Sequence, residues 1–167
     1  MALTACHKDE IEVRRVPKED AAPGLAGVVR PRGLSWTTPR GWVELPGDGM
    51  RAATLRPPAA LGRAEATIVA LPGDVGGELA NVNRWRGQIG LPPIDEAALA
   101  LLRKHVLAPV GPIDVYDFTG NGGEKSHLVA GMIQVRGTTW FFKLSGEARA
   151  VRAAKPAFLK MLRGLKI

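Results

Sequence analysis

The sequence has a single cysteine, Cys6, among 167 residues, which excludes an internal disulfide and a cysteine-rich zinc site. It has no run of eighteen or more apolar residues, so no helix is expected to span a membrane. Its histidines, His7, His105 and His127, lie far apart and lack the spacing of metal ligands. No serine has a Gly-x-Ser-x-Gly setting. We therefore expect no metal, no cofactor and no recognisable catalytic residue.

What remains is the composition of an ordinary globular chain, with 46% hydrophobic and 23% charged residues. A length of 167 residues fits one domain with a single core. The formal net charge of +7 favours an acidic partner, such as an anionic membrane, nucleic acid or an acidic protein. The alternative is that the basic surface serves solubility alone.

Cys6 follows an apolar residue and two small ones, Leu3-Thr4-Ala5, and polar residues come directly after it. This order resembles the processing box of bacterial lipoproteins, which implies cleavage before Cys6 and acylation of its thiol. A secretory signal needs a basic segment and about 7–15 apolar residues before the cleavage site. The hypothesis therefore requires a true N-terminus upstream of Met1. The alternative is an inert terminal thiol in a cytoplasmic protein.

Three segments are expected along the chain. Residues 1–6 are interpreted as a residual signal with its lipoprotein box. Residues 7–33 combine charge clusters with repeated Pro and Gly and lack apolar periodicity, which predicts a flexible linker, with a short strand near residues 11–16. The folded domain is expected over residues 34–167.

The apolar patterning of that domain predicts an α+β fold. The spacer at residues 57–62 suits a hairpin, and short turns between the later strands favour antiparallel neighbours. Strand runs separated by helices, without steady βαβ alternation, predict one antiparallel sheet with helices packed on it. In chain order we expect two strands, two helices, three strands and a helix, over residues 50–55, 65–71, 78–89, 96–106, 113–118, 128–135, 139–144 and 149–164.

Two stretches resemble known families. Trp36, the turn at residues 39–42 and the passage from residues 139–146 into a helix carrying Phe158 resemble the PsbP/Mog1-type layout. Residues 81–91 resemble uncharacterised bacterial envelope proteins that share an Asn-x-Asn-Arg-Trp-Arg-x-Gln-x-Gly-Leu signature. The resemblance covers about residues 34–165 and implies a sheet-and-helix binding domain without enzyme activity. The photosystem and small-GTPase partners of PsbP and Mog1 are not implied, because no binding motif of either occurs.

The candidate ligand site lies on the helix expected over residues 78–89. The glycine-rich loop at residues 73–77 would open this helix, and backbone N–H groups at a helix N-terminus favour an anion. Side chains able to hold a carboxylate, phosphate or sugar follow at helical spacing: Asn81, Asn83, Arg84, Trp85, Arg86 and Gln88. In the structural alternative the Asn side chains satisfy loop backbone, and the Arg side chains stack on Trp36 or Trp42.

Aromatic residues alternate along the strand expected at residues 139–144. Trp140 and Phe142 are predicted to share one face of the sheet, and Phe141 the other. An exposed Trp beside Arg84 or Arg86 would suit a sugar or peptide ligand. Core packing is the alternative use.

The C-terminal helix is expected to be basic. No acidic residue follows Glu147, whereas six basic ones do: Arg149, Arg152, Lys155, Lys160, Arg163 and Lys166. A basic amphipathic helix can lie on an anionic membrane. The alternative is a helix docked on the sheet with a solvated basic face.

These observations favour a non-enzymatic, lipid-anchored protein of the periplasm or outer cell envelope. It would be held to the membrane at Cys6 and would bind a protein partner or a small anionic ligand. One alternative is a hydrolase-like enzyme using Asp114, Asp117 or His127 near the glycine-rich turn at residues 120–123. Another is a basic cytoplasmic adaptor for nucleic acid or protein, although no nucleic-acid reader motif is recognisable.

Overall fold

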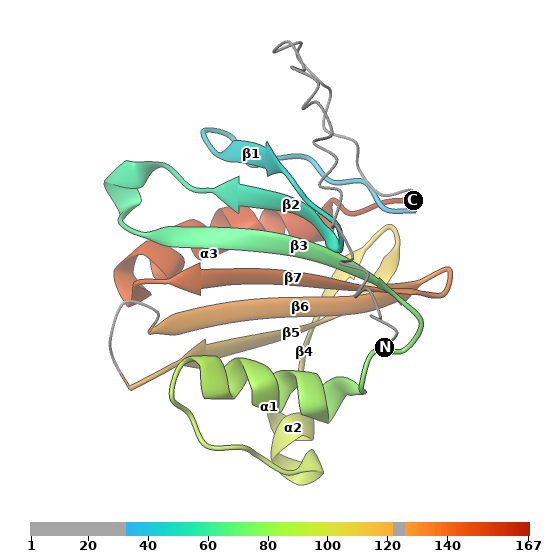
Figure 1. Cartoon of the computed structure of the whole chain (residues 1–167). Helices are drawn as coiled ribbons and strands as arrows, with labels where there is room; N and C mark the ends of the chain where they lie inside the picture. The colour runs from blue at the N-terminus through green and yellow to red at the C-terminus, as the bar shows by residue number, and fades with distance from the viewer. Residues whose placement is uncertain (1–32, 122–125) are drawn as a thin grey trace, which may run out of the picture.

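The computed structural model describes residues 33–121 and 126–167 (Figure 1). Its strands form one seven-stranded antiparallel sheet in the order β1-β2-β3-β7-β6-β5-β4. This confirms the expected α+β class and the hairpin between the first two predicted strands, β2 and β3. The strands are β1 (Val43–Pro46), β2 (Arg51–Arg56), β3 (Ala64–Pro72), β4 (Lys104–Ala108), β5 (Gly111–Thr119), β6 (His127–Val135) and β7 (Thr138–Gly146).

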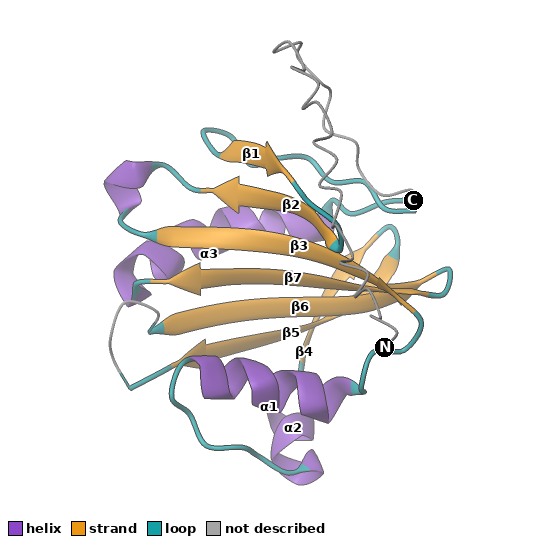
Figure 2. Cartoon of the chain, in the orientation of Figure 1, coloured by secondary structure: helices purple, strands orange, loops and turns teal. Residues whose placement is uncertain are grey.

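Helices cover the two faces of the sheet unequally (Figure 2). Helix α3 (Ala148–Arg163) lies across one face, while α1 (Glu78–Gln88) and α2 (Glu96–Leu102) lie on the other. A short 3-10 turn, η1 (Ala59–Leu61), joins β2 to β3. The core on the α1 side involves β5, β6 and β7, so no described helix covers that face of β1 and β2.

β7 lies at the centre of the sheet and pairs along its full length with both β3 and β6. Trp140 and Phe142 join the core on the α3 side, and Phe141 joins the core under α1. The predicted alternation of these aromatic residues is therefore confirmed. The aromatic residues of β7 therefore belong to the cores on both faces of the sheet.

Helix α3 completes the larger core with an apolar stripe. Its buried residues recur at helical spacing, which is the amphipathic pattern expected from the sequence. They are Ala150, Val151, Ala154, Phe158, Met161 and Leu162. Gly131 of β6 lies beneath this stripe, where an added Cβ would come within 3.2 Å of Leu162.

The helix predicted over residues 96–106 is wrong in its second half. α2 ends at Leu102, Arg103 takes an extended conformation, and β4 then pairs with β5. Leu99 is 1% exposed and packs into the core, whereas Leu101 is 87% exposed. Pairing with the free edge of β5 outweighs the helical preference of Arg103 and Lys104.

The strand at the other edge of the sheet, β1, was not predicted either. It has four residues and pairs only with β2. Its Val43 is 58% exposed, so it lacks the buried alternation that marks a strand in sequence. Short edge strands depend on the pairing partner rather than on a burial pattern of their own.

The start of the described chain lies beside its end. Ser35 N–H donates to the carbonyl oxygen of Lys166 at 2.7 Å, and Lys166 N–H donates to that of Ser35 at 3.2 Å. The segment entering the domain is therefore fixed next to the C-terminal end of α3. Cys6, the residual signal at 1–6, nearly all of the 7–33 segment and part of the turn at 120–123 lie outside the described residues. No helix within the described ranges is long and apolar enough to cross a membrane.

Gly146 and Gly87 provide a matched test of the packing at the end of β7. Gly146 has φ +154, and a Cβ there would lie 2.3 Å from the carbonyl oxygen of Arg63, whereas nothing lies within 4 Å of a Cβ at Gly87. Gly146→Ala is expected to lower the free energy of unfolding by about 1–3 kcal/mol. Gly87→Ala in α1 is expected to raise it by up to about 0.5–1 kcal/mol. Urea unfolding measures both, and wild-type stability in Gly146→Ala would contradict this account.

Candidate functional site

Asn81 and Arg84 fasten the loop that opens α1. The Asn81 side chain is buried, and its Nδ2 donates to the carbonyl oxygens of Val75 at 2.7 Å and Gly77 at 2.6 Å. Arg84 is exposed, and its Nη2 donates to Asn81 Oδ1 at 2.6 Å. Asn81 therefore has the loop-satisfying role of the structural alternative, while much of Arg84 stays accessible.

Asn83 and Arg86 hold the connection between α1 and α2. Asn83 Nδ2 donates to the carbonyl oxygen of Ile94 at 2.9 Å and its Oδ1 accepts from Ile94 N–H at 2.8 Å. Arg86 Nε donates to the carbonyl oxygen of Pro92 at 2.9 Å. The Arg86 guanidinium lies 5.2 Å from the centre of the Phe118 ring. The arginine stacking expected on Trp36 or Trp42 is thus found on Phe118.

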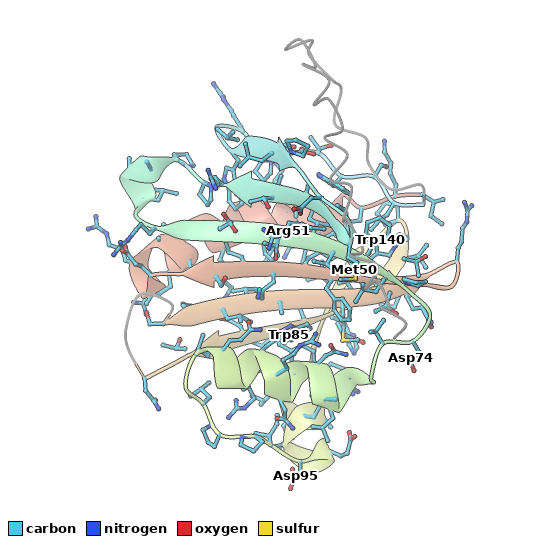
Figure 3. All side chains as sticks on the ribbon, viewed as in Figure 1. Met50, Arg51, Asp74, Trp85, Asp95 and Trp140 are labelled. Atoms are coloured by element: carbon cyan, nitrogen blue, oxygen red, sulfur yellow. The ribbon has the colours of Figure 1, made fainter. Side chains whose placement is uncertain are left out.

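Trp85 anchors α1 to the sheet. It is 3% exposed and points from α1 toward the strands (Figure 3). Its ring centre lies 5.9 Å from that of Phe141 and 6.4 Å from that of Tyr116. An indole in this position serves packing and is closed to a ligand.

Gln88 differs from the other signature residues because it faces the sheet beside an opening. It is exposed, and its Oε1 accepts from Lys143 Nζ of β7 at 2.9 Å. A cavity of about 260 Å³ lies here, lined by Gln88, Ile89, Leu128, Lys143 and Ser145. Asn81, Arg84 and Gln88 share one side of α1 by their spacing. Of the six predicted ligand-binding residues, Gln88 therefore lines this cavity, and Arg84 stays exposed one turn earlier on α1.

Lys143 and Ser145 are the site residues that the sequence analysis missed. They belong to β7 and alternate with Phe142 and Leu144, which point into the α3-side core. Polar residues between buried apolar ones mark the accessible face of a strand. That alternation is visible in the sequence, but the helix that borders this face is set by the order of the strands in the sheet.

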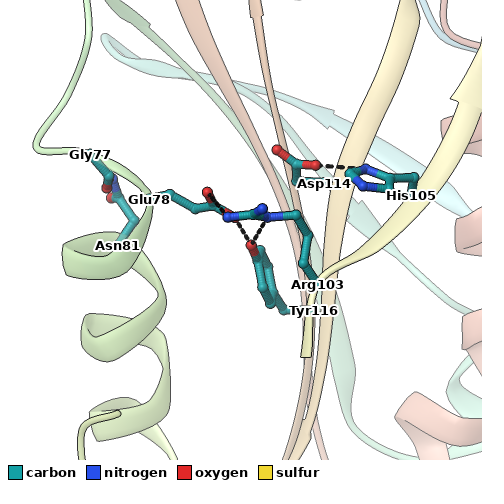
Figure 4. Close-up of polar contacts among 7 residues, drawn as sticks. All are labelled: Gly77, Glu78, Asn81, Arg103, His105, Asp114 and Tyr116. Carbon is teal, nitrogen blue, oxygen red and sulfur yellow. Dashed lines mark hydrogen bonds and ion pairs between the residues drawn. The ribbon is translucent and has the colours of Figure 1, made fainter. Parts of the chain in front are cut away.

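The first turn of α1 contains a carboxylate of its own, that of Glu78. Arg103 donates to both oxygens of Glu78 at 2.6 Å, and the Tyr116 hydroxyl also donates to Glu78 (Figure 4). The hydrogen bond to Glu78 raises the pKa of Arg103. Beside them His105 Nδ1 lies 2.9 Å from Asp114 Oδ1. The forked Arg103–Glu78 pair fixes the first turn of α1 to the junction of α2 and β4.

On the opposite face, Asp117 links the sheet to α3. Its Oδ1 lies 2.6 Å from His127 Nε2, and Lys155 of α3 donates to its Oδ2. His127 is 4% exposed, and its Nδ1 has no hydrogen-bond partner among the described residues. Because a carboxylate only accepts hydrogen bonds, His127 donates from Nε2 in this arrangement.

The hydrolase alternative grouped Asp114, Asp117 and His127, but the structure separates them. Asp114 faces His105 on the α1 side, whereas Asp117 and His127 face Lys155 of α3. Residues three apart on one strand point to opposite faces, so Asp114 and Asp117 cannot pair. Within the described ranges, no group of three or more His, Cys, Asp or Glu side chains is arranged to hold a metal ion.

No family model matches the sequence, and no curated protein matches it. The structure is similar to cyanobacterial PsbP (CyanoP) from Synechocystis sp. PCC 6803, with 15% identity, a TM-score of 0.48, and coverage of 87% of this chain and 98% of that one. It is also similar to LpqN, involved in cell envelope biogenesis of Mycobacterium tuberculosis, with 15% identity, a TM-score of 0.42, and coverage of 82% and 87%. Both similarities concern the fold alone. Membership of a family defined by the 81–91 signature stays a prediction.

Asp117 generates a pH-dependent prediction. Burial alone raises its pKa, but hydrogen bonds from Lys155 and His127 outweigh burial, so the pKa lies below its ordinary value. A carboxyl with a lowered folded pKa stabilises the protein above the unfolded value of about 3.9 and loses this effect as the pH falls through the folded pKa. Asp117→Asn is therefore expected to lower the free energy of unfolding by about 1–3 kcal/mol at neutral pH.

Urea unfolding of both proteins from neutral pH to about pH 3 measures this effect. The difference between wild type and Asp117→Asn should shrink below about pH 4. Asp74→Asn is the control, because Asp74 is exposed and takes part in none of the ion pairs between described residues. A difference that stays constant with pH would contradict the assigned role of Asp117.

Proposed function

We propose that this protein is a non-enzymatic binding protein of the bacterial cell envelope that takes a small anionic ligand beside α1. The observation that carries the proposal is the meeting of Gln88 and Lys143 at the rim of a 260 Å³ cavity. The ammonium group of Lys143 supplies a positive charge there. Arg84, one turn before Gln88 on the same side of α1, is a second cation, exposed on this side of the helix.

The lining of the cavity narrows the class of ligand. Lys143 and Gln88 offer N–H donors and Ser145 a hydroxyl, whereas Ile89 and Leu128 form an apolar wall. A volume of about 260 Å³ is smaller than the roughly 300–1,000 Å³ of most small-molecule sites. The fit is therefore to a short carboxylate or phosphate ester with a small apolar part.

The proposed anchor accounts for the location in the envelope. The Leu3-Thr4-Ala5-Cys6 sequence supports acylation at Cys6, with residues 7–33 as a linker and residues 34–167 as the binding domain. The described chain begins at the edge of the sheet-and-helix body, beside the end of α3. A linker that starts there would leave the cavity at α1 free of the attachment point.

Thermal unfolding with a panel of acetate, butyrate, inorganic phosphate and glycerol 3-phosphate tests the ligand site. A ligand that binds only the folded protein stabilises it by RT ln(1 + [L]/Kd). We expect at least one of these anions to raise Tm, and Lys143→Gln to weaken its affinity by about tenfold or more.

Arg51→Gln is the matched control, because Arg51 is an exposed arginine of β2 outside the cavity lining. It should leave the affinity unchanged. The proposal fails if none of the panel raises Tm, or if Arg51→Gln and Lys143→Gln weaken binding equally.

Mass spectrometry of protein extracted from membranes, expressed with its native upstream sequence, tests the anchor. The expected result is an acylated Cys6 at the mature N-terminus and loss of Cys6→Ala from the membrane fraction. An unmodified Cys6 thiol in soluble protein would remove the anchor from the proposal.

A further inference from the structure

The excess positive charge of the described domain is concentrated in its last helix. Residues 33–121 and 126–147 contain ten basic and ten acidic residues, whereas the six charged residues after Glu147 are all basic. The body of the domain is thus neutral, and α3 with the residues that follow it carries the net charge. Such a separation of charge indicates a directional field rather than general solubility.

Four of the five cations of α3 lie on its outer side, whereas Lys155 is half-buried and donates to Asp117. The spacing of these four places them opposite the buried stripe centred on Phe158, and all four are exposed. We call this surface the basic face of α3; it comprises Arg149, Arg152, Lys160 and Arg163. None of the ion pairs between described residues includes a member of it.

The acidic groups that border α3 are already paired. Asp117 lies against Lys155 and His127, and Glu147 accepts from Arg63 Nε at 2.8 Å. That hydrogen bond lowers the pKa of Glu147 and keeps it ionised beside Arg63. The basic face is therefore not neutralised by the carboxylates next to it.

A hollow interrupts the basic face and suits an anionic group. It has a volume of about 440 Å³ and is lined by Arg152, Lys155, Pro156, Leu159 and Arg163. Two guanidinium groups border it, and guanidinium recognises phosphate with forked hydrogen bonds. The aliphatic parts of Pro156 and Leu159 provide an apolar floor.

The position of the attachment segment favours a membrane as the source of that anion. The hydrogen bonds between Ser35 and Lys166 place the start of the domain at the C-terminal end of the basic face. A coil-like linker of about 27 residues spans roughly 30 Å. A lipid at Cys6 would hold this end of α3 near the bilayer at high effective concentration, so weak contacts would suffice.

We infer that the basic face of α3 docks the domain on a bilayer of anionic phospholipid. The apolar stripe of α3 is buried in the core, so the contact is electrostatic adsorption without insertion of the helix. The choice of a bilayer rests on the proposed anchor, whereas the charged surface stands on the structure alone. Each cation near an anionic bilayer strengthens binding about fivefold.

Vesicle co-sedimentation of the full chain with Cys6→Ala tests the inference without any contribution from an acyl chain. Phosphatidylcholine vesicles with about 30 mol % phosphatidylglycerol should bind the protein at about 0.05 M salt, and binding should be lost near 0.5 M because charges are screened. Pure phosphatidylcholine vesicles should bind at least tenfold more weakly. Arg152→Gln/Lys160→Gln/Arg163→Gln should weaken binding to the anionic vesicles by about 100-fold.

The matched control is Arg51→Gln/Arg56→Gln/Arg136→Gln, which removes the same charge from exposed positions outside α3. It should weaken binding less than threefold, and urea unfolding checks that both variants fold. Equal losses in the two variants, or equal binding to both vesicle types, would overturn the inference. Tighter binding to a short DNA duplex than to anionic vesicles at the same salt would assign the face to nucleic acid instead. Cys6 acylation is measured separately, so failure of the anchor and failure of the docking face are distinguishable.

Discussion

The aromatic residues of β7 are buried on both faces of the sheet, and this burial organises the two helix layers. Trp140 and Phe142 require a cover on one side and Phe141 on the other. Helix α3 covers Trp140 and Phe142 on one face, and α1 covers Phe141 on the other through Trp85. Because β7 pairs along its full length with β3 and β6, it also joins the N-terminal hairpin to the C-terminal strands.

The same constraint creates the candidate ligand site. Trp85 fixes α1 against β7, and Asn81, Asn83 and Arg86 then fasten the loops on either side of the helix. These contacts stabilise α1 at the border of the sheet face that no described helix covers. Lys143, on the accessible side of β7, is brought to Gln88 as a result. Most of the signature in residues 81–91 therefore serves to position α1, and its last polar residue, Gln88, reaches the cavity.

How far the sequence could predict this structure depended on burial. Strands with alternating buried residues, such as β3 and β7, and the amphipathic helix α3 were predicted with small errors at their ends. The edge strands β1 and β4 were not, because exposed residues such as Val43 of β1 and Leu107 of β4 carry no burial pattern. The signature residues on α1 were predicted as one site, but their partners are loop carbonyls, which periodicity does not reveal. Lys143 was missed because its neighbour is distant in sequence.

The α+β class, the alternation of the central strand and the basic character of the last helix were all evident from the amino-acid sequence. These properties follow from local periodicity and composition, which are the same wherever the element lies. Three other features became visible only in the folded chain: Asp114 and Asp117 face opposite sides, Gln88 meets Lys143, and the chain enters the domain beside the end of α3. Each of these depends on strand order and register, which are set by pairing between segments far apart in the chain.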